Sequence, residues 1–111
     1  GSFPLWLAPV QLVILPIADR HEAYARELQE TFRAEGFRVQ VDDSREKVNK
    51  KIRQAELQKI PLMAIVGDKE VSNGNLSLRI HGQGDRGQIP VADLMARLKD
   101  LVNNKSLEIK I

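Results

Sequence analysis

Apolar residues along this chain recur in two rhythms that predict strands alternating with helices. Residues 10–17 (VQLVILPI) form a continuous apolar run rich in β-branched side chains, and residues 61–68 (PLMAIVGD) begin with another apolar run. Runs of this length are typical of strands buried on both faces. Residues 37–43 (FRVQVDD) alternate between apolar and polar positions instead. That alternation predicts a strand with one solvated face.

Three further segments have helical character. Residues 18–36 place apolar side chains at roughly helical spacing, between a D-x-x-E cap (Asp19, Glu22) and a stop at Gly36; these side chains are Ala23, Leu28, Phe32 and Ala34. Residues 90–104 (PVADLMARLKDLVNN) predict a closing helix with Pro90 near its first turn.

The middle helix is predicted by a second D-x-x-E cap, formed by Asp43 and Glu46, and it should end before Pro61. Its core-facing side chains are expected to be Val48, Ile52, Ala55 and, at its end, Leu57.

The last third of the chain predicts more β-structure. Residues 69–81 (KEVSNGNLSLRIH) contain Asn73–Gly74, a strong short-range signal for a β-hairpin. Residues 82–88 (GQGDRGQ) are expected to form a loop. Residues 106–111 (SLEIKI) alternate and predict a short terminal strand.

The predicted order β-α-β-α-β-β-α indicates an α/β fold, with a mixed β-sheet flanked by about three helices. The 111 residues, 42% of them hydrophobic, suffice for one core, so we expect a single domain over residues 3–111, with Gly1–Ser2 left over from expression. The absence of cysteine excludes disulfides and thiolate metal sites. The apolar opening segment is short, interrupted by prolines and lacks a basic start, so neither a signal peptide nor a membrane span is predicted.

Catalytic patterns are sparse. His21 and His81 are far apart in the sequence and lack metal-ligand spacing. The neighbouring carboxylates Asp42 and Asp43 are compatible with a catalytic dyad and with a helix cap. The glycine-rich residues 82–87 lack the phosphate-loop pattern. We therefore predict that this chain has no catalytic site of its own.

The most basic stretch is residues 45–55 (REKVNKKIRQA), where only Glu46 and Glu56 offset six basic residues counted through Lys59. Such a row is either the solvated face of a helix or a surface for a negatively charged partner such as an RNA backbone. The side chains expected to face outwards are Arg45, Lys47, Lys50, Lys51 and Arg53.

A second candidate feature is the pair Glu70 and Arg79, which lie on either side of Asn73–Gly74. In a paired hairpin both side chains could project to one region of the surface. A carboxylate can accept hydrogen bonds from guanine, and a guanidinium can donate to the carbonyl oxygens of G or U. The alternative is a cross-strand Glu–Arg salt bridge. The residues alone leave both interpretations open.

Several motifs together resemble one family. Residues 3–11 (FPLWLAPVQ), 51–61 (KIRQAELQKIP), 66–71 (VGDKEV) and 76–79 (LSLR) are similar, in order and spacing, to the C-terminal anticodon-binding domain of threonyl-tRNA synthetases, which are class IIa aminoacyl-tRNA synthetases. The resemblance covers nearly the whole chain. It implies the mixed-sheet fold of class IIa anticodon-binding domains and a role in binding the anticodon stem-loop of threonine tRNA.

The resemblance also implies residue roles. The family's glutamate in GDKEV and the arginine of the following strand read anticodon bases, and these positions are Glu70 and Arg79 here. The helix holding residues 45–53 would face the anticodon loop, with Lys51 and Arg53 in the matching KIR. The implied parent enzyme is a dimeric, cytoplasmic, ATP-dependent ligase whose zinc and threonine sites lie in a catalytic domain. This domain would need no cofactor, would bind no membrane and would be monomeric when isolated.

The chain departs from the family pattern NEKLGYKIR. Arg45 replaces the asparagine, Asn49 the glycine and Lys50 the aromatic residue. The Arg45 departure supports an alternative function, a free-standing or paralogous domain of the same fold that acts as a protein-interaction or regulatory module. A small α/β enzyme is a third possibility, for which the sequence offers no site.

Overall fold

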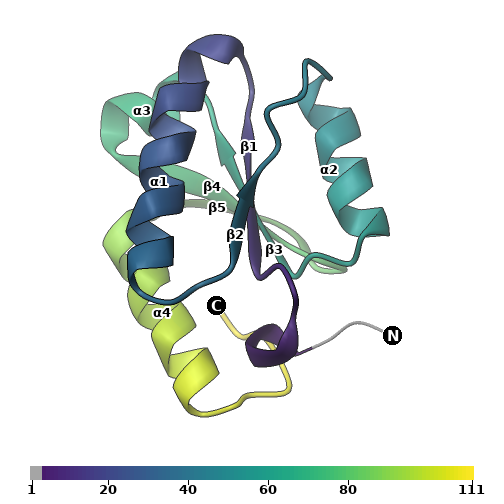
Figure 1. Ribbon diagram of the computed structural model, residues 1–111, viewed down its shortest axis with the longest axis vertical. Helices are drawn as coiled ribbons and strands as arrows, with labels where there is room; N and C mark the ends of the chain where they lie inside the picture. The colour runs from purple at the N-terminus through teal and green to yellow at the C-terminus, as the bar shows by residue number, and fades with distance from the viewer. Residues whose placement is uncertain (1–3) are drawn as a thin grey trace.

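A five-stranded mixed sheet lies between helices in the computed structural model, which describes residues 4–111 (Figure 1). The prediction about Gly1–Ser2 lies outside the described residues. The strands are β1 (Leu12–Pro16), β2 (Val39–Val41), β3 (Leu62–Val66), β4 (Asn75–Ile80) and β5 (Gly84–Pro90), in the sheet order β2-β1-β3-β4-β5. Strand β1 pairs in parallel with β2 and β3, whereas β3–β4 and β4–β5 are antiparallel. The mixed α/β fold is therefore confirmed.

The helices cover the two faces of the sheet unequally. Helices α1 (Glu22–Ala34) and α4 (Val91–Asn103) pack on one face, where their buried residues share a core with alternate residues of β1, β3 and β4. Helix α2 (Val48–Leu57) packs on the other face against Val13, Leu15 and Met63. All five residues of β1 are buried because helices cover it on both sides, as its continuous apolar run predicts.

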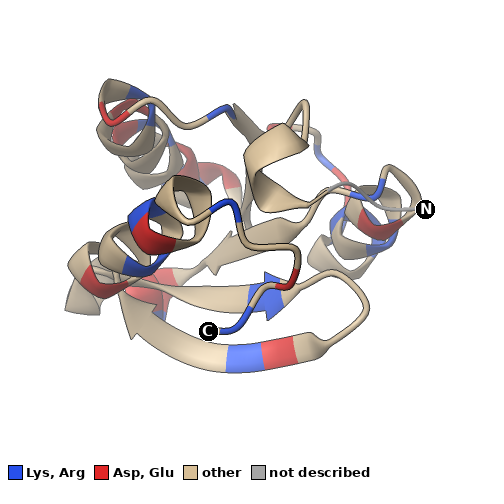
Figure 2. Ribbon diagram, turned by 90° about the horizontal axis from the view of Figure 1, so that it is seen from below, with Lys and Arg blue, Asp and Glu red and all other residues tan. Residues whose placement is uncertain are grey.

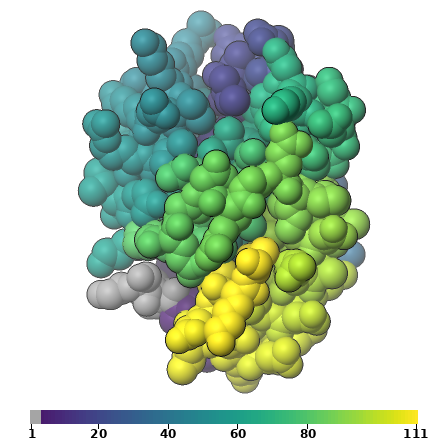
Figure 3. Space-filling view, turned by 180° about the vertical axis from the view of Figure 1, so that it is seen from behind, coloured from purple at the N-terminus to yellow at the C-terminus, as the bar shows by residue number. Residues whose placement is uncertain are grey.

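Within residues 4–111, no helix covers the α2 face of the half of the sheet formed by β4 and β5. Residues directly opposite each other in neighbouring strands point to the same face of a sheet. Met63 lies opposite Arg79, and Ser77 lies opposite both Ile65 and Gln88. Arg79, Ser77 and Gln88 therefore point to the α2 face. In Figure 3 the green segment of these strands forms the visible surface beside α2. We call this surface the open sheet face.

The predicted hairpin around Asn73–Gly74 is wrong. Residues Asp68–Asn73 form a short helix, α3, and Gly74 ends it in the left-handed conformation at φ 67°. The predicted loop at residues 82–88 is also wrong, because Gly84–Pro90 form strand β5. The antiparallel hairpin of this fold is therefore β4–β5. A register shift between Leu78 and Arg79 accompanies the glycine-rich sequence of β5.

Smaller differences concern element ends. Helix α2 begins at Val48, after Lys47, and its start has no side-chain cap; Asp42 instead accepts a hydrogen bond from the Ser44 N–H. Leu57 is 76% exposed and so does not face the core.

The other deviations are at the ends of the chain and of the first long helix. A single 3-10 turn, η2 (Asp19–His21), precedes α1, and Ala23 and Ala34 are exposed. A second 3-10 turn, η1 (Leu5–Leu7), precedes β1. Residues 106–111 form no strand, although Ile109 and Ile111 pack against the larger core cluster.

Candidate nucleic-acid interface

Glu70 is held at the start of α3 by the turn that follows β3. Its Oε1 atom accepts a hydrogen bond from the Gly67 N–H at 2.8 Å, which caps the helix. Glycine suits this turn because a Cβ on residue 67 would lie 2.7 Å from Ile17 Cδ1. The second oxygen, Oε2, accepts a hydrogen bond from Gln88 Nε2 at 3.0 Å. Glu70 as a residue is 6% exposed, and both of its carboxylate oxygens hold hydrogen bonds.

Arg79 lies on the open sheet face, opposite Met63 of the neighbouring strand. Its side chain is half-buried, and its Nε has no hydrogen-bond partner within residues 4–111. Over the same residues no ion pair joins Arg79 to Glu70, which bonds instead to Gly67 and Gln88. The salt-bridge interpretation of this pair is therefore wrong.

A row of hydrogen-bonded polar groups leads from Glu70 through Gln88 to Asn75 of β4 and then to Tyr24 of α1. Gln88 donates to Glu70, and its Oε1 accepts from Asn75 Nδ2 at 2.9 Å. The backbone carbonyl of Asn75 accepts from the Tyr24 hydroxyl at 2.7 Å. Burial, followed by the charges of Glu27 and Glu70, raises the pKa of Tyr24. Sequence reasoning missed Gln88 because it placed residues 82–88 in a loop.

The basic residues of α2 lie on different flanks of the helix. Glu56 contacts His81 at the end of β4, with 3.3 Å between its Oε2 and the histidine Nε2, so its flank faces β4. Arg53 is three residues earlier and shares that flank. Lys50 lies further round the exposed surface, where its Nζ is 3.3 Å from Glu46 Oε2. Arg53 is therefore the predicted α2 side chain nearest the open sheet face.

Two further predicted residues precede α2. Lys47 is exposed at the helix start. Arg45 is exposed and lines a cleft of about 290 Å³ beyond the ends of β1 and β2, together with Ser44, Lys51 and the carboxylates Asp19, Glu22 and Glu46. In Figure 2 the basic segments are likewise spread over several elements with acidic ones among them. The cleft carries mixed charge and does not form a basic patch.

Lys51 was expected to face outwards, and this prediction is wrong. Its side chain is 4% exposed. The Nζ atom donates to the carbonyl of Pro16 at 2.9 Å and to that of Asp42 at 3.1 Å. These carbonyls end β1 and follow β2, so Lys51 ties the ends of two strands to α2. Its role in this structure is to hold the scaffold on which the exposed cations are displayed.

An ionic contact anchors α3 to the first helical turn. Arg20 bonds both oxygens of Asp68 at 2.8 and 2.9 Å, and His21 Nε2 lies 2.6 Å from Asp68 Oδ1. His21 Nδ1 accepts from the Ala18 N–H, so the ring proton is on Nε2 and is donated to Asp68. The hydrogen bond from Arg20, followed by that from His21, holds the pKa of Asp68 well below its ordinary value.

The other candidate sites do not have the arrangement of side chains that the sequence left open. Asp42 and Asp43 form no dyad, because Asp42 binds the Ser44 N–H and Asp43 pairs with Arg26 at 2.9 Å. Within residues 4–111, no three His, Asp or Glu side chains form a group that could hold a metal ion. No helix in that same range is long and apolar enough to cross a membrane.

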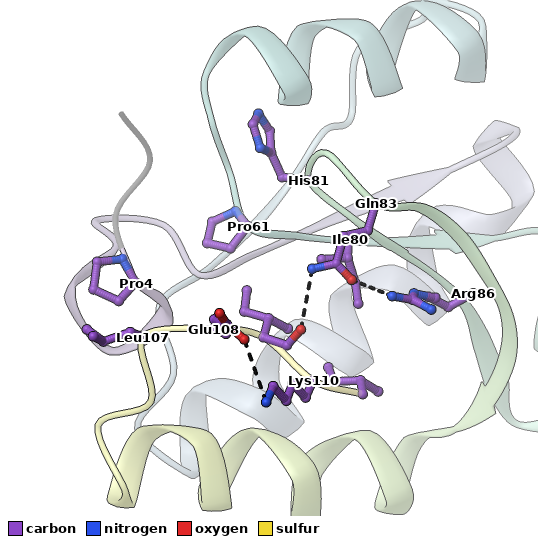
Figure 4. A pocket seen from close by; sticks show the side chains of 11 residues that line it. Pro4, Pro61, Ile80, His81, Gln83, Arg86, Leu107, Glu108 and Lys110 are labelled. Atoms are coloured by element: carbon purple, nitrogen blue, oxygen red, sulfur yellow. Dashed lines mark hydrogen bonds and ion pairs between the residues drawn. The ribbon is translucent and has the colours of Figure 1, made fainter.

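A cavity of about 820 Å³ lies at the end of the sheet remote from α3, between the β4–β5 turn and the C-terminal residues (Figure 4). Several of its polar groups already pair with one another. Gln83 donates to the Ile109 carbonyl and accepts from Arg86, and Lys110 pairs with Glu108. The cavity is therefore separate from the row that begins at Glu70.

Comparisons with known proteins agree with one another. A family model described as "Anticodon binding domain" matches residues 11–101. The threonine–tRNA ligase of Desulforamulus reducens is 47% identical over 107 residues, and that of Acidobacterium capsulatum is 48% identical over 106 residues. Each alignment covers 96% of this chain but only 17% and 16%, respectively, of the relative. The chain thus spans about a sixth of the length of these curated relatives.

A solved structure has the same fold. The RNA binding domain of threonyl-tRNA synthetase from Cryptosporidium parvum Iowa II superposes with a TM-score of 0.86, covering 100% of this chain and 26% of that chain. The two sequences are 24% identical, so this likeness concerns the fold.

Proposed function

The chain belongs to the anticodon-binding domain family, and we propose that it is the anticodon-binding domain of a threonine–tRNA ligase. The observation that carries the proposal is the 47–48% identity to threonine–tRNA ligases over 96% of the chain. The placement of Glu70 and Arg79 around the open sheet face supports it. A free-standing interaction module is not favoured, because no relative described above is such a protein.

In this proposal, the affinity for the RNA backbone and the recognition of bases come from different elements. The exposed cations Arg45, Lys47, Lys50 and Arg53 attract the phosphates of the anticodon stem-loop, which gives affinity without sequence preference. Single-stranded loops are read through unstacked bases whose edges meet protein hydrogen-bonding groups. The half-buried side chain of Arg79 lies on the open sheet face, where its guanidinium can donate to base carbonyls. Glu70 supplies a fixed acceptor at the start of α3.

The rest of the ligase would lie outside this chain. We expect ATP, threonine and zinc to be bound by its catalytic part, with no cofactor bound by the anticodon-binding domain. Such an enzyme would act in the cytoplasm as a homodimer, and the isolated 111-residue chain would be monomeric.

The proposal is tested by fluorescence anisotropy with RNA hairpins. One hairpin carries the threonine anticodon loop, and others carry single base replacements in the anticodon. The unmodified chain should prefer the threonine hairpin. Arg79→Met should weaken the binding of the threonine hairpin by a factor of about 5 to 150, which corresponds to the 1–3 kcal/mol of a good base contact. The binding of one hairpin with a replaced base should stay the same.

Lys50→Met serves as the comparison, since it should weaken the binding of all hairpins alike. It should also reduce the slope of log K against log salt concentration by about 0.7, the value for one phosphate contact on a single strand. An unmodified chain that binds every hairpin equally at all salt concentrations would refute the proposed function.

A further inference from the structure

Gln88 has the surroundings of a ligand-binding side chain, although it lies outside the sequence motifs described above. It lies on the edge strand β5, directly opposite Ser77. Arg79 is two residues beyond Ser77, on the same face of the sheet. The Gln88 side chain is exposed, whereas its partner Glu70 is buried. Among the polar side chains of this row, Gln88 is thus a reachable one.

The orientation of the Gln88 amide is fixed in the free protein. A carboxylate only accepts hydrogen bonds, so Gln88 must present its NH₂ group to Glu70, 3.0 Å away. Its Oε1 then faces Asn75 Nδ2 at 2.9 Å. Turning the Gln88 amide over would place two acceptors against each other at Glu70, whereas the Asn75 amide can turn with it, because its Oδ1 has no other partner within residues 4–111. The Glu70 carboxylate therefore sets the orientation of the Gln88 amide, which reduces the ordering cost of binding a ligand.

The fixed amide retains unused hydrogen-bonding capacity. A glutamine side chain has two N–H donors and two acceptor lone pairs. Glu70 takes one donor and Asn75 takes one lone pair, so one donor and one acceptor remain on an exposed group. An adjacent donor and acceptor is what the edge of a nucleobase requires.

Two unpaired atoms of β4 indicate that this strand lacks a partner on the same face. Arg79 Nε and Asn75 Oδ1 are both buried and unbonded within residues 4–111. Folded proteins leave few buried polar atoms unpaired, and such atoms are often found where a ligand or water completes the network. Both atoms belong to β4, the strand beside Gln88.

We propose that Gln88 is a specificity-determining residue whose amide hydrogen-bonds directly to an unstacked base of the bound RNA loop, next to the contacts of Glu70 and Arg79. This inference rests on the proposed function, because it takes the anticodon loop as the ligand. It adds a base-contacting side chain that comes from β5.

The test compares Gln88→Ala with Gln40→Ala. Gln40 is also an exposed glutamine on an edge strand, β2, and it points to the same sheet face, opposite Val13, but lies beyond α2. Using the hairpin series above, Gln88→Ala should weaken the threonine hairpin roughly threefold to tenfold, the range of one or two neutral hydrogen bonds. At one anticodon position the replaced hairpin should bind the variant and the unmodified chain equally. Gln40→Ala should change no hairpin.

A direct contact is separated from mere support of Glu70 by a double-variant cycle. If Gln88 contacts a base, Gln88→Ala should still reduce selectivity in a Glu70→Gln background. If the Glu70→Gln background removes the whole effect, or if Gln88→Ala weakens all hairpins equally, the direct contact is refuted. Thermal unfolding of each variant identifies any loss of structure. Selective binding by the unmodified chain, together with unaltered selectivity of Gln88→Ala, would overturn this inference while leaving the proposed function intact.

Discussion

Replacing Lys51 by methionine tests whether this residue stabilises the fold or contacts the RNA. Methionine keeps an unbranched apolar stem but cannot donate to the carbonyls of Pro16 and Asp42. Hydrogen bonds from a charged donor contribute about 1.5–3 kcal/mol each, so two lost bonds amount to roughly 3–6 kcal/mol. Removing a buried charge that has no carboxylate partner relieves part of its desolvation cost. We expect a net loss of about 2 kcal/mol in the free energy of unfolding.

Thermal denaturation followed by circular dichroism measures this loss. An unfolding entropy of about 2.1 cal/mol/K per residue gives about 0.23 kcal/mol/K for this chain, so Tm should fall by about 9 °C. Lys50→Met is the matched control, because Lys50 is half exposed and its pair with Glu46 is an i,i+4 surface pair that contributes only about 0.3–0.5 kcal/mol. Its Tm should change by no more than about 2 °C.

Lys51→Met should have the larger effect on stability, whereas Lys50→Met should have the larger effect on RNA binding. At a temperature where both are folded, Lys51→Met should keep the salt dependence of hairpin binding, whereas Lys50→Met should flatten it. An unchanged Tm for Lys51→Met, combined with a flattened salt slope, would refute the assignment of Lys51 to the scaffold.

Two further predictions concern the fold. The pKa of Asp68 is lowered in the folded chain, chiefly by Arg20, so its contacts stabilise the fold above the unfolded pKa of about 3.9 and cease to do so as the pH falls through the folded value. The difference in urea midpoint between the unmodified chain and Asp68→Asn should therefore narrow as the pH falls below about 4, and a difference that widens there would contradict this account. Leu78→Ala should cost roughly 2–5 kcal/mol because Leu78 is 1% exposed; Leu57→Ala, at 76% exposure, should change urea stability by about 0.5 kcal/mol or less, and equal losses would contradict the assigned burial.

The sequence predicted the elements whose periodicity is long and clear. The runs that became β1 and β3 and the helices α1, α2 and α4 were all recognised. The short helix α3 was missed because six residues hardly display a helical period. Gly74 made the error easy, since a helix C-cap and a tight hairpin turn both require a glycine at positive φ. Strand β5 was missed because its glycines, Gly84 and Gly87, are a loop signal in the sequence. Both have positive φ in the structure but lie within the strand.

The error over Lys51 could have been avoided from spacing alone. Lys51 is three residues after Val48 and four before Ala55, which places it on the face that carries the apolar side chains. Its charge suggested solvent, but a long lysine stem can cross an apolar layer and bring its ammonium group to free carbonyls. Those carbonyls lie 35 and 9 residues away in the chain, so no local pattern could identify them.

Because residues 68–73 form a helix and not a hairpin strand, Glu70 has less freedom than the sequence predicts. On a hairpin strand its side chain would stand free, and both carboxylate oxygens could meet a guanine edge. As the third residue of α3, it commits Oε1 to the Gly67 N–H, and Oε2 is shared with Gln88. A buried and partly committed carboxylate provides less discrimination alone than a free one, and a second group must supply the remainder. The exposed amide that contacts Oε2 is placed to do so, which is why Glu70→Gln should leave a residual base preference that Gln88→Ala then removes.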